Sequence, residues 1–98
     1  DDYYQTAENY FKGEDGFKKN IEKSKKWYLK AAEAGNILAQ DDVGSKYLDG
    51  SDGFLKDEEK AVYWVQKAAE AGNVNAQVTF FYFYNKGIGS IKKSRKTA

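Results

Sequence analysis

The sequence of 98 residues contains no cysteine, histidine, proline or methionine. Without cysteine it has no disulfide, thiolate metal site or thiol nucleophile, and without histidine it lacks the commonest metal ligand and the usual proton shuttle. The absence of proline favours long uninterrupted helices. Because methionine is missing, we expect the sequence to be a processed form or an excised piece of a longer protein. Its lack of cysteine fits the cytosol and leaves export open.

An excess of charge of one sign is also missing. Sixteen Lys and Arg residues face fifteen Asp and Glu residues, giving a net charge of +1, which argues against a polyanion binder driven by bulk charge. No apolar run approaches the ~18 residues of a membrane span, and no secretory leader is visible. Aromatic residues make up 16%, too many for a disordered chain. We expect one folded domain with no membrane span, nucleic-acid partner or cofactor.

The sequence repeats itself at an interval of 37 residues. The segment 31–36, Ala-Ala-Glu-Ala-Gly-Asn, recurs at 68–73, and Trp27 recurs as Trp64. Tyrosines and glycines keep the same interval, at Tyr10, Tyr47 and Tyr84 and at Gly13, Gly50 and Gly87. An interval in the thirties is typical of stacked helix pairs or a similar solenoid.

Each repeat is predicted to hold two helices, A and then B. Asn36, Asp57 and Asn73 are suited to cap helix starts, and Gly50 and Gly72 to end helices. These signals predict A helices over 1–12, 37–49 and 74–86, B helices over 20–34 and 57–71, and a truncated third B helix from residue 94. Apolar and small residues at helical spacing predict the buried stripes. In the central pair the stripes comprise Ala39, Val43, Gly44 and Tyr47 in helix A and Ala61, Trp64, Val65 and Ala68 in helix B.

This pattern resembles the Sel1-like repeat, a relative of the tetratricopeptide repeat, over nearly the whole chain. The matching positions are Tyr10, Gly13, Gly16, Trp27, Ala31 and Gly35 in the first repeat and Ala39, Gly44, Tyr47, Gly50, Gly53, Trp64, Ala68 and Gly72 in the second. The resemblance implies an all-α fold, a single right-handed α-solenoid of antiparallel helix pairs over residues 1–98. It also implies an adaptor or scaffold role without catalytic residues, because the shared motif is structural. Phe81 departs from it by standing where Gly44 supplies a small residue.

Two features that suggest chemistry have simpler interpretations. The glycine loops 13–16 and 50–53 lack both the Lys-Ser/Thr pair of a P-loop and the oxygen ligands of an EF-hand, so we interpret them as turns. Asp42 and Asp49 lie two helical turns apart, about 10 Å along the axis, which is too far for a simple acid–base pair. We therefore expect no enzyme.

The variable positions of the A helices form the candidate partner-binding face. A helical wheel places these positions, and also Lys46, on the side of the helix opposite the buried stripe. The candidates are Tyr4, Glu8, Leu38, Asp41, Asp42, Ser45, Asp49, Val78, Tyr82 and Phe83. An acidic middle and an aromatic end predict a groove for a basic or amphipathic peptide of another protein, in which Asp41, Asp42 and Asp49 attract basic groups. Tyr82 and Phe83 would be apolar anchors. The alternative is a solvated face without a partner.

The C-terminal third leaves further interpretations open. Residues 78–84 are the most apolar stretch, which suits burial under a further repeat, a partner or self-association surface, or a strand-like end. Residues 92–96 hold four cations, for which a solvated end is favoured over nucleic-acid or membrane contact. The second functional hypothesis is thus a structural spacer or self-association segment of a longer solenoid.

Overall fold

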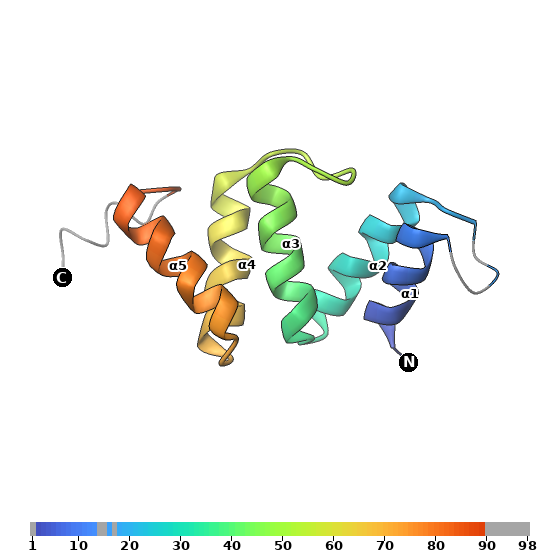
Figure 1. Cartoon of the computed structure of the whole chain (residues 1–98), viewed down its shortest axis with the longest axis horizontal. Coiled ribbons are helices and arrows are strands. Elements are labelled where there is room, and N and C mark those ends of the chain that lie inside the picture. Colours follow the sequence, from blue (N-terminus) through green and yellow to red (C-terminus); the bar gives the residue numbers. More distant parts are fainter. Residues whose placement is uncertain (1, 14–15, 17, 90–98) are drawn as a thin grey trace.

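The computed structural model describes residues 2–13, 16 and 18–89, which form five helices and no strand within these ranges. The helices are α1 (Tyr3–Lys12), α2 (Ile21–Glu33), α3 (Ile37–Asp49), α4 (Glu58–Glu70) and α5 (Val74–Lys86). They stand side by side in chain order along a molecule of 50 × 24 × 17 Å (Figure 1). The expected third B helix from residue 94 lies outside the described residues.

Local capping explains where each helix begins and ends. The helices start after Asp2, Asn20, Asn36, Asp57 and Asn73, whose side chains each accept a hydrogen bond from the backbone N–H three residues later. The A helices end at glycines in the left-handed conformation, with φ between +68° and +73°. Because capping residues lie outside the helix, α2 and α4 are one residue shorter at each end than the expected ranges.

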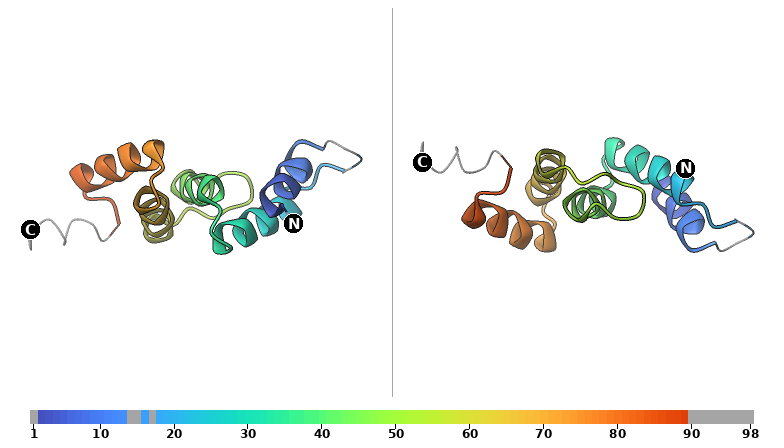
Figure 2. Two further views of the ribbon diagram at one scale, coloured as in Figure 1. Left: turned by 90° about the horizontal axis from the view of Figure 1, so that it is seen from below. Right: turned by 90° about the horizontal axis from the view of Figure 1, so that it is seen from above.

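The helices form two layers, with α1, α3 and α5 on one side and α2 and α4 on the other (Figure 2). Small residues between them let the backbones approach closely, and larger rings fill the wider gaps. The small core residues are Ala7, Ala31, Ala32, Ala39, Ala61, Ala68 and Ala76. The buried rings are Tyr28, Tyr47, Phe54, Trp64 and Phe83. The rings of Tyr47 and Phe54 in the second repeat meet edge-on, with their centroids 4.9 Å apart.

The closest approach of two helices lies at Gly44. A Cβ atom added there would lie 2.6 Å from Val65 Cγ2, 3.2 Å from the Val65 nitrogen and 3.3 Å from the Ala61 carbonyl oxygen. The equivalent residue in α1 is Ala7, which is also fully buried. The equivalent residue in α5 is Phe81, which is 66% exposed. Only a very small residue therefore fits where an A helix meets the B helix that follows it.

Candidate protein-binding face

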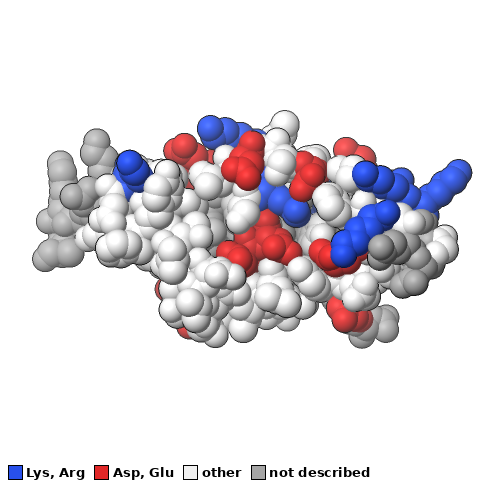
Figure 3. All heavy atoms as spheres, in the orientation of Figure 1, with Lys and Arg blue, Asp and Glu red and all other residues white. Residues whose placement is uncertain are grey.

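Three carboxylates gather where α1 meets α3. The Tyr4 hydroxyl donates a hydrogen bond to Asp42 Oδ2 at 2.7 Å and so joins α1 to α3. The Tyr28 hydroxyl donates to Glu8 Oε2 and so joins α2 to α1. With Asp41, the residues Glu8 and Asp42 form what we call the acidic cluster. Figure 3 shows Asp and Glu side chains gathered over the middle of this face, around α3.

The surroundings of Asp41 and Asp42 disfavour their negative charge. Partial burial raises the pKa of Asp42, although Lys46 and the hydrogen bond from Tyr4 lower it again in part. Partial burial raises the pKa of Asp41 as well, and the nearby charge of Asp42 adds to that effect. Burial and the carboxylate partners also raise the pKa of the Tyr4 and Tyr28 hydroxyls, which therefore stay protonated as donors. A cation bound from outside would stabilise these carboxylates.

The Lys46 side chain packs within the fold and does not face the solvent. Its Nζ atom is 2.9 Å from Asp52 Oδ2, and it lies 5.0 Å and 5.2 Å from the ring centroids of Tyr28 and Phe11. Only 15% of its side chain is exposed. The helical wheel was wrong here, because the aromatic rings of the first repeat cover the lysine.

Phe83 is a second correction to the helical wheel. This residue is fully buried in the core and cannot serve as an anchor for a partner. Its register equivalents, Asn9 and Lys46, are also largely covered. Helix α3 therefore buries a second side, on which Lys46 faces the preceding helix pair, whereas the wheel assumed one stripe. Asp42 is only half-exposed for the same reason.

The other candidate residues reach the surface. Leu38 is 57% exposed, Ser45 and Asp49 are exposed, and Val78 and Tyr82 are 66% and 51% exposed. The structure brings Tyr4, Glu8, Asp41 and Asp42 together. Asp49 lies two turns away from Asp42, at the C-terminal end of α3. The role of these residues in binding stays a prediction.

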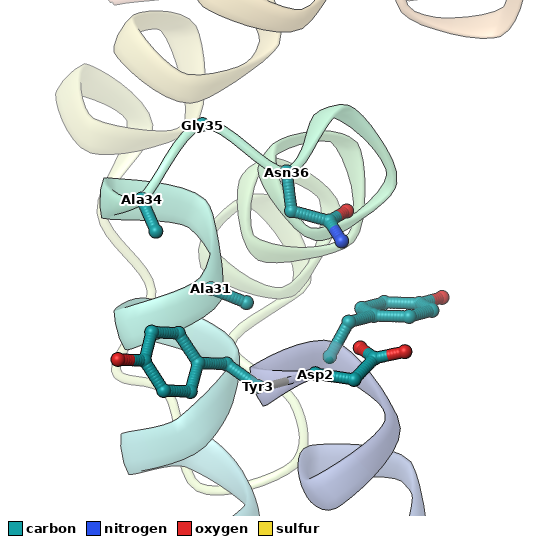
Figure 4. Close-up of a pocket in the computed structure, with 7 residues that line it drawn as sticks. Asp2, Tyr3, Ala31, Ala34, Gly35 and Asn36 are labelled. Atoms are coloured by element: carbon teal, nitrogen blue, oxygen red, sulfur yellow. The ribbon is translucent and has the colours of Figure 1, made fainter.

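A pocket of about 630 Å³ opens beside the acidic cluster, between the start of α1 and the turn from α2 to α3. Its lining is Asp2, Tyr3, Tyr4, Ala31, Ala34, Gly35 and Asn36. Figure 4 shows the side chains of Asp2 and Asn36 turned toward the same space. The pocket shares Tyr4 with the acidic cluster, so one bound segment could contact both. Sequence reasoning missed this pocket, whose only signal was the tyrosine pair at the start of α1.

The acidic cluster has a testable effect on stability. A raised carboxyl pKa means that folding favours the protonated form of the carboxyl group. The stability that this group contributes is present below the ordinary Asp pKa of about 3.9, and it is lost as the pH rises through the raised value. We expect the variant Asp41→Asn/Asp42→Asn to be slightly more stable than the parent at pH 7 and equally stable at pH 3. Urea unfolding at both pH values measures this. A variant that is less stable at pH 7 would show that the carboxylates stabilise the fold.

Comparison with known proteins identifies the repeat. The family model described as Sel1 repeat matches residues 2–36, 37–73 and 79–98. The chain belongs to the Sel1 repeat family. The crystal structure of a Sel1 repeat protein from Oxalobacter formigenes matches with a TM-score of 0.83 and 36% sequence identity over 89% of this chain. The match covers 64% of that protein's chain. No curated protein sequence matches significantly.

These findings confirm the resemblance and the all-α solenoid fold. Sel1 repeats generally mediate protein–protein interaction and are typically non-catalytic. No helix in the described part of the Sel1 chain is long and apolar enough to cross a membrane. Within residues 2–13, 16 and 18–89, no His, Cys, Asp and Glu side chains, those of the acidic cluster included, are arranged in a group that could hold a metal ion.

Proposed function

We propose that this Sel1 repeat chain is a non-catalytic adaptor that binds a basic segment of another protein across α1 and α3. The acidic cluster is the observation that carries the proposal, because two of its carboxylates, Asp41 and Asp42, are partly buried at a cost that a bound cation would reduce. The adjoining pocket offers room for a side chain of the same segment. Leu38 and Ser45 are exposed on α3 and supply further contact surface.

Charge complementarity makes the expected partner a basic peptide. Partly buried carboxylates interact more strongly with a cation than fully solvated ones do, since the effective dielectric constant around them is lower. The aromatic rings of Tyr3 and Tyr4 at the pocket can pack on the planar head of an arginine. We therefore favour arginine over lysine in the bound segment.

A labelled peptide of alternating arginine and leucine tests the proposal by fluorescence anisotropy. We expect the variant Asp41→Asn/Asp42→Asn to bind it roughly tenfold more weakly than the parent, the loss of one to two desolvated charge contacts. The matched control is Glu33→Gln/Glu70→Gln, which removes the same charge from two exposed positions on α2 and α4. The control should bind like the parent.

Three results would contradict this assignment. Equal affinity of the parent and the Asp41→Asn/Asp42→Asn variant would remove the acidic cluster from the binding site. An equal loss in both double variants would mean that net charge alone attracts the peptide. No binding by the parent would favour the second hypothesis, a spacer within a longer solenoid.

A further inference from the structure

Helix α5 has apolar residues on two opposite sides. One side packs on the preceding pair through Ala76 and Phe83, which are fully buried. The other side carries four exposed apolar residues at spacings of four, seven and eight. We call them the α5 stripe: Val74, Val78, Phe81 and Tyr82, which are 69%, 66%, 66% and 51% exposed. Such spacing is that of a helix face that packs against another element.

The α5 stripe is specific to this helix. Its register equivalents in α3 are Ile37, Asp41, Gly44 and Ser45. Three of these four positions thus change from polar or small in α3 to large and apolar in α5. An exposed apolar patch on the order of 400 Å² is of the size that marks interaction sites on soluble proteins.

The neighbouring glutamines show that α5 lacks a cover that α3 has. Gln40 and Gln77 occupy equivalent positions in α3 and α5. Gln40 donates a 3.1 Å hydrogen bond to the backbone oxygen of Ala32 in α2, and Gln77 donates one of 3.1 Å to the backbone oxygen of Ala69 in α4. Gln40 is 7% exposed, whereas Gln77 is exposed. The inner contacts of the two helices are therefore alike. The difference is that α4 covers α3, while no described element covers the same side of α5.

Phe81 leaves no room for a further B helix packed as closely as α4 packs on α3. Even a Cβ atom at the equivalent Gly44 would lie 2.6 Å from a side chain and 3.2 Å from the backbone of α4. A phenyl ring there requires the covering helix to stand farther away. The element that covers the α5 stripe therefore has a geometry different from the α3–α4 pair.

We propose that a second copy of this chain covers the α5 stripe, with the two α5 helices antiparallel around a two-fold axis at Val78. In this arrangement Val78 packs on Val78 of the second copy, and Tyr82 packs on Val74. The larger Tyr82 thus meets the smaller Val74 on both sides of the axis, so these positions of the stripe complement each other. An isologous contact of this kind closes at two copies.

The charges of α5 suit such a pair. The helix contains no acidic residue, and its single cation, Lys86, lies at its end. Antiparallel packing places the two copies of Lys86 at opposite ends of the interface. Figure 3 shows almost no charge over α5 on the face it presents. The net charge of +1 leaves little repulsion between copies.

The size of the stripe sets the expected strength. A stable complex buries about 800 Å² on each partner, and the stripe offers roughly half of that. The dimer is therefore weak and depends on concentration. Because the dimer covers the α5 stripe, a basic peptide can bind only at α1 and α3. Each copy keeps one such site.

Sedimentation velocity of the full chain from about 5 to 500 µM measures the association. We expect the mean mass to rise from one toward two copies over this range. Val78→Glu should stay monomeric throughout, because it places two carboxylates together on the axis. The matched control is Leu55→Glu, at an apolar residue that is 82% exposed outside the stripe, which should associate like the parent.

Cysteine cross-linking places the two-fold axis. Because the chain has no cysteine, the variant Val78→Cys has a single thiol, which mild oxidation should convert to a covalent dimer at least tenfold faster than the thiol of Leu55→Cys. A parent that stays monomeric at every concentration would overturn the proposal. Association that survives Val78→Glu, or a mass that grows beyond two copies, would overturn it as well. The association is measured without any peptide, so its outcome does not depend on the basic-peptide hypothesis.

Discussion

Gly44→Leu is expected to lower the free energy of unfolding by roughly 2–3 kcal/mol, as overpacking of a close helix contact does. Helix propensity alone would change stability the other way, since glycine within a helix costs about 1 kcal/mol relative to a good helix former. The steric term should prevail because the added atoms meet the backbone of α4 as well as Val65. Val65 is itself fully buried.

Urea unfolding followed by circular dichroism measures the Gly44→Leu effect. The control is Ser45→Leu, on the exposed side of the same helix, which should change stability by less than about 0.5 kcal/mol. A double-mutant cycle of Gly44→Ala with Val65→Ala identifies the cause, because removing the clashing methyl should make the pair less destabilising than the sum of the single changes. Equal losses for Gly44→Leu and Ser45→Leu would mean that α3 and α4 do not need this close contact.

Phe83→Ala is expected to cost about 3–4 kcal/mol, the usual cost of truncating a fully buried phenylalanine. Phe83 is the largest fully buried side chain of the described structure. Each helix of a solenoid packs mainly on its neighbours, so the loss should fall first on α5. Hydrogen exchange should therefore become faster in residues 74–86 while α1 and α2 keep their protection.

Phe81→Ala is the matched control for this prediction. It removes the same ring two positions away, from a residue that is 66% exposed. Measured at low concentration, where the chain is monomeric, it should change stability by less than about 0.5 kcal/mol. If Phe81→Ala were the more destabilising change, the assignment of the buried and exposed sides of α5 would be reversed.

The helices were predictable because their signals act over short distances. The capping residues Asn36 and Asp57 each bind a backbone N–H only three residues away, and Gly50 ends α3 through its own backbone conformation. The interval of 37 residues then repeats these local signals along the chain. Local rules and the repeated motif thus lead to the same solenoid.

The site was less predictable because it depends on how successive pairs are oriented. The Tyr4–Asp42 hydrogen bond joins residues 38 positions apart, and no single residue determines that geometry. The same orientation covers Lys46 and Phe83, which a helical wheel assigned to the solvent side. The wheel describes one helix and its main apolar stripe, whereas α3 packs on both the preceding helix α2 and the following helix α4.

The order of the helices also has a mechanical consequence. The main packing contacts join helices that are neighbours in the chain, so a force that pulls on the two ends passes through these contacts in series, as in a spring. The Tyr4–Asp42 hydrogen bond bypasses α2 in this series, because it links α1 directly to α3. Stretching the molecule would separate these helices and pull the carboxylates apart. A ligand that bridges α1 and α3 would in turn make the α1–α3 half of the solenoid more resistant to stretching.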